Sequence, residues 1–360
     1  TRDIKLTAVN NHSADSSTIL KSRSEVSIEG VILNSEGSKD SDFNGEVYIT
    51  LYDAEKTTTS HGYDDSIPVE FKERNNKLFS GRAMVRNGSF SHTFRMPKET
   101  SFSNKHGLFS LYAHSEQGVE ASGSNDNIII GGAADDAATD TIGPDITYCY
   151  LNSTQFSDGD IVNESPVLFA AFNDPSGINL STAGIGHNMS ITVDKQISFN
   201  DIDNYYTPDT TGYSGSIYYP IGELEEGEHE LTLRVWDNEG NSSSVSLTFI
   251  VQKGLAPEII KIYADQNPAR TSTNFYLEHD RPNGVITVNI NVYNIQGMPV
   301  WSTQKTGTSD LFKSFPINWN LTSNSGARIP GGVYIYQATI STDNTHYTTK
   351  SQKLLVTPAR

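Results

Sequence analysis

Several features that point to particular classes of protein are scarce or missing in this sequence of 360 residues. A single cysteine, Cys149, excludes an intrachain disulfide and a cysteine-rich zinc site. No apolar run approaches the roughly 18 residues that a membrane-spanning helix needs. The first residues, TRDIKLTAVNN, lack the apolar core of a signal peptide. We therefore expect either a cytosolic protein or a piece of a longer, exported precursor.

Positive charge is also scarce, with 26 Lys and Arg against 43 Asp and Glu and a formal net charge of −17. This balance argues against nucleic acid as a partner. The net charge is −7 over residues 1–142, −13 over residues 143–254 and +3 over residues 255–360. The change of sign predicts that the last segment is a separate domain with a separate role.

Helical periodicity is rare, and alternation of apolar and polar residues takes its place. The segments GEVYITLYD (45–53), HELTLRVWD (229–237) and ITVNINVYN (286–294) all have this two-residue period. Each of them predicts a strand with one buried face. VRNGSFSH (85–92) has Asn-Gly between strand residues and predicts a tight hairpin.

Two segments interrupt the strand pattern and predict domain boundaries. GGAADDAATDTIGPD (131–145) is small and polar, and QKGLAP (252–257) ends in Gly and Pro after a strong strand. We predict an all-β chain of three tandem immunoglobulin-like β-sandwiches, because each part has the size of such a domain. The predicted domains are residues 1–131, 144–252 and 256–360, the last of which we call the tail.

Catalytic chemistry has few candidates in this sequence. Nucleophilic catalysis would need Cys149 with a base in reach, and His187 is the best candidate base. Nothing in the sequence places the two side by side, and a buried structural cysteine is the competing interpretation. The nine histidines lack metal-binding spacing, and nucleotide-binding glycine motifs are absent. We therefore expect no catalytic residue and no nucleotide cofactor in this chain.

Acidic loops in the middle domain offer oxygen ligands that suit Ca²⁺. They are DGD (158–160), DPSG (174–177), DID (201–203) and DNEGN (237–241). None has the spacing of a known calcium loop, and Asp and Asn in loops often cap turns through the backbone. A structural Ca²⁺ in the middle domain and simple turn capping therefore both remain open.

The three tryptophans raise the alternative of a glycan-binding module or a multi-domain surface adhesin. Trp301 and Trp319 would favour sugar binding if they were exposed side by side. Trp236 ends a strand with several apolar residues, which favours a structural role.

An ordered series of motifs in the middle domain resembles the PorU family, the sortases of the type IX secretion system of Bacteroidota. The series is FNDPSGIN (172–179), GIGHNMSITVD (184–194), DNYY (203–206) and GSIYYPIGELEEGEHELTLRVWDNEGNSSS (215–244). The first domain resembles the segment that follows the peptidase domain of this family, and the resemblance covers essentially the whole chain. Its motifs are FNGEVYITLYD (43–53), LFSGRAMVRNGSF (78–90), FRMPKE (94–99) and IIIGG (128–132).

The tail resembles the C-terminal signal domain of the type IX system. The matching motifs are QNPAR (266–270), VYNIQGMPVW (292–301), NSGARIPGGVYIYQ (324–337) and KLLV (353–356). That family usually opens Pro-Asn-Pro, whereas Gln266 stands at the first position here.

The resemblance implies a role for a non-catalytic region. PorU-like proteins are gingipain-class cysteine peptidases at the cell surface, reached by export through the periplasm, that cleave C-terminal signals from cargo and attach the cargo to anionic lipopolysaccharide. Their catalytic Cys and His lie in a caspase-like domain before the region matched here, so no catalytic residue transfers to this chain. The implied partners are type IX cargo, through the catalytic domain, and the outer-membrane shuttle barrel PorV, through the tail.

We expect docking through the residues that carry the tail resemblance, and their alternative role is simply to fold the tail. These residues are Asn267, Pro268, Gly331, Gly332, Tyr334, Tyr336 and Lys353.

Overall fold

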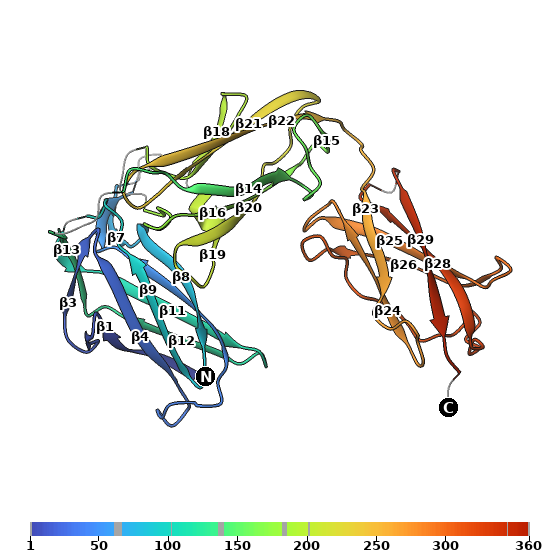
Figure 1. Cartoon of the computed structure of the whole chain (residues 1–360), viewed down its shortest axis with the longest axis horizontal. Helices are drawn as coiled ribbons and strands as arrows, with labels where there is room; N and C mark the ends of the chain where they lie inside the picture. Colours follow the sequence, from blue (N-terminus) through green and yellow to red (C-terminus); the bar gives the residue numbers. More distant parts are fainter. Residues whose placement is uncertain are drawn as a thin grey trace. The chain divides into compact units, whose positions relative to one another are not determined.

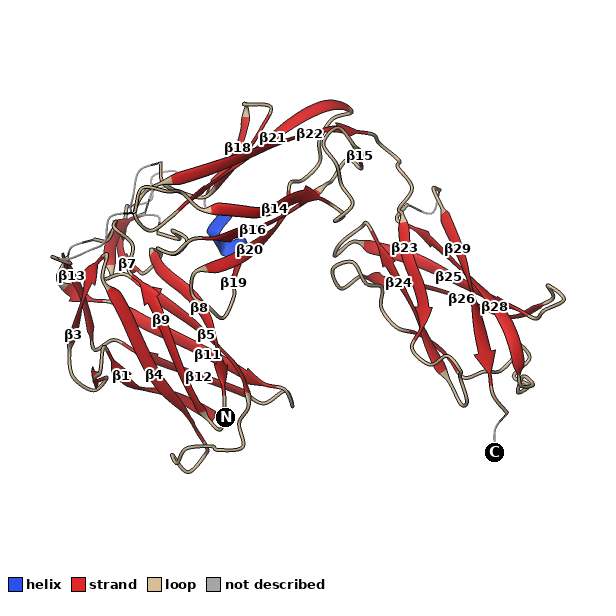
Figure 2. Cartoon of the chain, viewed as in Figure 1, coloured by secondary structure: helices blue, strands red, loops and turns tan. Residues whose placement is uncertain are grey.

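The computed structural model consists almost entirely of strands and loops (Figure 2). It contains one short 3-10 helix, η1 (Ile202–Tyr205), among the residues that it describes. In that part of the chain no helix is long and apolar enough to cross a membrane. The described residues are 2–60, 67–101, 103–135, 140–181, 186–200, 202–343 and 345–358.

The all-β, immunoglobulin-like fold that the alternating pattern predicts is confirmed. The chain forms two compact units, which we describe separately. Unit 1 comprises residues 1–149, 168–219 and 229–248, and unit 2 comprises residues 150–167, 220–228 and 249–360. The division into three domains stays a prediction.

The first part of unit 1 is built on a large sheet (Figure 1). Its strand order is β8-β5-β11-β12-β1-β4-β9, with β2 paired to β1. Most neighbours are antiparallel, but β1 runs parallel to β12. A second sheet, β10-β13-β3, and a β6-β7 ribbon complete this part. The strands are β1 (Arg2–Val9), β2 (His12–Ser13), β3 (Thr18–Ser22), β4 (Glu25–Leu33), β5 (Gly45–Tyr52), β6 (Lys56–Thr59), β7 (Glu70–Glu73), β8 (Lys77–Val85), β9 (Ser89–Arg95), β10 (Lys105–His106), β11 (Leu108–Ser115), β12 (Glu120–Asn125) and β13 (Ile128–Ala133).

The predicted strand and hairpin of this part are both present. In β5 the side chains of Val47, Ile49 and Leu51 are fully buried, while those between them face outward. The turn between β8 and β9 has positive φ at Asn87 (49°) and Gly88 (70°), as a type I′ hairpin requires. The buried face of β5 and the turn between β8 and β9 therefore both follow from neighbouring residues in the sequence.

Residues 145–251 supply two further sheets, in the orders β14-β16-β20-β19 and β15-β22-β21-β17-β18. The predicted inward row of β21 is confirmed, because Leu231, Leu233 and Val235 are fully buried. The strands are β14 (Asp145–Leu151), β15 (Ile161–Val162), β16 (Val167–Asn173), β17 (Ser190–Val193), β18 (Ile197–Asn200), β19 (Tyr206–Pro208), β20 (Ser214–Pro220), β21 (Gly227–Trp236) and β22 (Ser242–Val251).

Unit 2 contains the tail, a sandwich of a three-stranded sheet, β23-β24-β27, and a four-stranded sheet, β26-β25-β28-β29. The inner strands β25 and β28 lie side by side, with β29 beyond β28 (Figure 1). The strands are β23 (Ile259–Ala264), β24 (Thr273–His279), β25 (Val285–Tyr293), β26 (Pro299–Thr308), β27 (Ile317–Trp319), β28 (Gly332–Ser341) and β29 (Thr348–Val356).

Inward side chains of the two tail sheets form one core. The predicted row of β25 is confirmed, since Ile286, Val288, Ile290 and Val292 are all fully buried. Burial of each such side chain contributes about 1.5–3 kcal/mol relative to exposure. The tail therefore has a substantial apolar core of its own.

Candidate functional site

The strand that carries the Gly-Gly-Val-Tyr motif is central rather than at an edge. β28 pairs with β25 on one side and with β29 on the other. Its backbone groups are thus occupied, so a partner strand cannot add to it. Any contact that this strand makes with a partner must use the side chains that face outward.

Two of the predicted docking residues point into the tail core. Tyr334 is 5% exposed and Tyr336 is 1% exposed. The Tyr336 ring lies 4.7 Å from that of Phe275, and the Tyr334 ring packs edge-on at 6.4 Å from Trp319. The Tyr334 hydroxyl also donates a hydrogen bond to the carbonyl of Pro330 at 2.8 Å. Both side chains are placed to stabilise the fold.

The other predicted residues gather near the end of β29. The Asn267 side chain donates to the carbonyl of Lys353 at 3.1 Å and accepts from the backbone N–H of Leu355 at 2.9 Å. The peptide bond between Asn267 and Pro268 is cis. Lys353 is exposed, and no ion pair is found for it among the described residues.

The two glycines before β28 differ in their surroundings. A Cβ atom at Gly331 would lie 2.9 Å from Pro358, so the chain end packs against this position. A Cβ atom at Gly332 would meet nothing within 4 Å. Glycine is therefore required at position 331, because Pro358 lies too close for a side chain. At position 332 the available space does not by itself require glycine.

The tryptophans do not form an open sugar platform. Trp301 and Trp319 stack at 5.4 Å, as side-by-side residues would, but Trp319 is only 1% exposed. Its indole N–H donates to the carbonyl of Thr322 at 2.8 Å. Trp236 is 9% exposed and packs against the ring of His187 at 4.3 Å. All three side chains take part in packing.

Cys149 and His187 have separate environments. Burial raises the pKa of the Cys149 thiol to about 12, which disfavours the thiolate that a nucleophile needs. His187 Nδ1 lies 2.6 Å from the carboxylate of Glu99. Within the described ranges no hydrogen bond joins Cys149 to His187.

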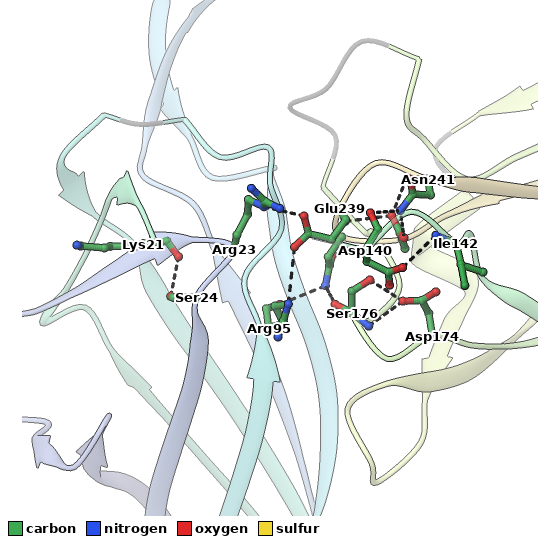
Figure 3. A network of polar contacts seen from close by, with 12 residues as sticks. Lys21, Arg23, Ser24, Arg95, Asp140, Ile142, Asp174, Ser176, Glu239 and Asn241 are labelled. Carbon is green, nitrogen blue, oxygen red and sulfur yellow. Dashed lines mark hydrogen bonds and ion pairs between the residues drawn. The ribbon is translucent and has the colours of Figure 1, made fainter. Parts of the chain in front are cut away.

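A buried polar network joins distant segments of unit 1 (Figure 3). Glu239, in the turn after β21, is 6% exposed. Its carboxylate accepts a hydrogen bond from Arg23 Nε at 2.6 Å, and Arg95 Nη1 lies 3.8 Å from the other carboxylate oxygen. Because an unpaired buried charge costs several kcal/mol, these arginines hold the turn against the first sheet of unit 1.

Neighbouring contacts extend this network through motifs that the sequence singled out. The Asn238 side chain donates to the carbonyls of Arg95 (3.1 Å) and Ser176 (2.9 Å). Lys98 donates its backbone N–H to the carbonyl of Asn238 at 2.7 Å. The FRMPKE, DPSG and DNEGN segments therefore meet in space, which their positions in the sequence do not indicate.

Two of the four acidic loops, DPSG and DNEGN, also lie close together, and Asp140 joins them (Figure 3). Carboxylate oxygens of Asp140, Asp174 and Asp237 all lie within 4.8 Å of one another, and the last two side chains are almost fully buried. Burial raises the pKa of Asp174, and the charges of its two neighbours raise it further, against the lowering effect of hydrogen bonds from Ser176.

The remaining acidic loops have other contacts. Asp160 accepts a hydrogen bond from the backbone of Ser157 at 2.8 Å, which caps a turn. Asp203 pairs with Lys77 at 3.1 Å. Asp201 lies outside the described residues.

A structural Ca²⁺ in the middle domain stays a prediction, and Asp140, Asp174 and Asp237 are a group of described residues that could hold it. If it is correct, Ca²⁺ at 100 times its Kd should stabilise the chain by about 2.7 kcal/mol, because the ion binds only the folded form. We expect Asp237→Asn to remove this gain and Asp158→Asn, in the DGD loop, to retain it. Thermal unfolding with Ca²⁺ and with a chelator measures the difference. An unchanged midpoint for the unmodified chain would leave these residues as turn caps.

Comparison with known proteins finds similarity among solved structures. No protein-family model matches the chain, and no curated protein matches it. Among solved structures, dimeric latent PorU from Porphyromonas gingivalis is 29% identical, with 100% of this chain and 34% of that chain covered and a TM-score of 0.45.

Two further solved structures are much less similar. A mixed-linkage glucan-binding protein from Bacteroides ovatus, SGBP-B, is 12% identical over 99% of this chain and 70% of that chain, with a TM-score of 0.28. A bacterial ice-binding adhesin is 11% identical over 100% of this chain and 98% of that chain, with a TM-score of 0.21. This chain is thus similar over its whole length to about a third of PorU.

Proposed function

We propose that this chain is the non-catalytic C-terminal region of a PorU-like cell-surface sortase. In this proposal it positions the peptidase domain that cleaves C-terminal signals and attaches cargo to anionic lipopolysaccharide. The tail docks the enzyme to the outer-membrane barrel PorV. The protein is exported through the periplasm and stays associated with the outer membrane.

The ordered series of motifs along the chain carries this proposal. In the tail the motif segments are far apart in sequence, yet they contact one another. Ala269 of QNPAR exchanges backbone hydrogen bonds with Leu355 (2.8 Å) and Thr357 (2.9 Å) at the end of β29. Arg328 of the NSGARIPGG segment donates to the carbonyls of Arg270 and Thr271. The motif segments thus meet at one end of the tail, and such an arrangement suits a surface that another protein recognises.

The polar network of unit 1 supports the positioning role. It ties segments from both parts of the unit together through a buried carboxylate and several backbone hydrogen bonds. A spacer that orients a catalytic domain benefits from such fixed contacts, because a flexible linker would not hold an orientation.

Binding of the full chain to purified PorV in detergent tests the docking role. We expect saturable binding to PorV and none to an unrelated outer-membrane barrel of similar size, because docking depends on a specific protein surface. Surface plasmon resonance with the chain immobilised measures both. Absence of PorV binding would refute the docking role. Tight binding to a glycan array instead would favour the adhesin or glycan-binding alternative.

A further inference from the structure

An exposed apolar cluster lies on the outward face of the tail's four-stranded sheet. Val333 (45% exposed) and Leu355 (41%) face each other across β28 and β29, and Ile335 (38%) follows on β28. The turn between β25 and β26 adds Ile295 (69%) and Met298 (62%). We call these five residues the tail patch.

The tail patch is contiguous because of strand register. Ile335 lies opposite Tyr293, the last residue of β25, on one side and opposite Lys353 on the other. The turn that contains Ile295 and Met298 begins directly after Tyr293. Single exposed apolar residues are common on protein surfaces, whereas contiguous exposed apolar groups often mark interaction sites.

The same sheet face continues from the patch as rows of neutral polar side chains. Charged residues are usual on a solvated strand face, and their depletion is typical of interface cores. Cross-strand pairing defines two such rows, which are Ser302-Asn291-Gln337-Ser351 and Gln304-Asn289-Thr339-Thr349.

Charge at this end of the tail is of one sign. Three cations, Arg270, Arg328 and Lys353, belong to the segments that meet at this end of the tail, and no ion pair is found for them in the described ranges. These segments contain no Asp or Glu, and they are residues 266–271, 293–302, 320–336 and 351–358.

We propose that the tail patch docks a protein surface with an apolar centre and carboxylates around it. The inference rests on the proposed function and specifies which face of the tail is used. The apolar cluster fits the centre, and Lys353, which lies opposite Ile335 across β28 and β29, complements an acidic rim. The rows of amides and hydroxyls favour a protein over a lipid surface, because a protein can pair with their donors and acceptors.

The test replaces the strand part of the patch without disturbing the core. The full chain with Val333→Thr, Ile335→Thr and Leu355→Thr keeps outward, strand-compatible side chains. Val285→Thr is the matched control, because Val285 is 61% exposed at the opposite end of β25. We expect the triple variant to bind purified PorV at least about tenfold more weakly and the control to bind as the unmodified chain does.

A second pair of variants tests charge and guards against misfolding. Ile295→Ser with Met298→Ser changes only the turn, and we expect it to weaken binding severalfold. We expect Lys353→Glu to weaken binding more at low salt than at high salt, because screening removes the electrostatic part. Circular dichroism confirms that each variant is folded.

The outcomes separate this inference from the proposed function. If the unmodified chain binds PorV and the triple and turn variants bind it equally well, the proposed docking role of the tail patch is wrong and the proposed function stands. Absence of PorV binding by every form would overturn both. Binding to phosphatidylglycerol vesicles that the triple variant loses, with PorV binding unaffected, would assign the patch to a membrane and overturn it as a protein-docking surface.

Discussion

Replacing both Arg23 and Arg95 by Ala is expected to destabilise unit 1 by about 3–5 kcal/mol, the range for a buried charge that loses its partners. Glu239 keeps its carboxylate buried in the turn after β21, and the two arginines are the cations that contact it. Without them the carboxylate must remain unpaired, take up a proton or pull the turn into water. Urea unfolding at neutral pH measures the loss.

Two controls make this result specific. Arg82→Ala breaks a more exposed pair with Glu46 at 3.3 Å and should cost at most about 1 kcal/mol. Adding Glu239→Gln to the double arginine variant removes the buried charge and should restore much of the stability. Equal losses for the buried and exposed pairs, or no recovery with Glu239→Gln, would contradict the role of this network.

Replacing Tyr336 by Ala is expected to destabilise the tail by roughly 3–5 kcal/mol, as for other large buried aromatic residues. The ring is fully buried against Phe275, and the surrounding strands can close the cavity only in part. Tyr336→Phe keeps the packing and should cost less than about 1 kcal/mol. Denaturant unfolding followed by tryptophan fluorescence reports on the tail, because Trp319 is in the same core.

The same two variants decide how Tyr336 contributes to docking. We expect Tyr336→Phe to bind PorV as the unmodified chain does, because its hydroxyl is not on the exposed face. Tyr336→Ala should lose binding only under conditions in which the tail unfolds. A folded Tyr336→Phe chain that fails to bind would show that the hydroxyl itself is recognised.

The sequence predicted the strands because their signals are local. The two-residue alternation of β5, β21 and β25 needs only neighbouring residues, and so does the Asn87-Gly88 turn. The buried faces of these strands follow from the same pattern. The motif series gave the resemblance to PorU-like sortases in the same way, from residues read in order.

The acidic cluster and the buried network could not be predicted in this way. Asp140, Asp174 and Asp237 lie in three separate segments, and their proximity depends on how the strands between them pair. The sequence marks DPSG and DNEGN as candidate ligand loops, but nothing in their spacing distinguishes them from DGD. Asp140 carried no signal of its own.

Alternation in Gly331–Tyr336 shows that Tyr334 and Tyr336 share one face and that Val333 and Ile335 share the other. That much is determined by the sequence. Only the tertiary structure decides that the tyrosines face the core and that β28 is a central strand, because the aromatic side chains of β24 and β27 supply the surface against which they pack. Strand order and packing partners are long-range properties, and they leave Val333 and Ile335 exposed to a partner.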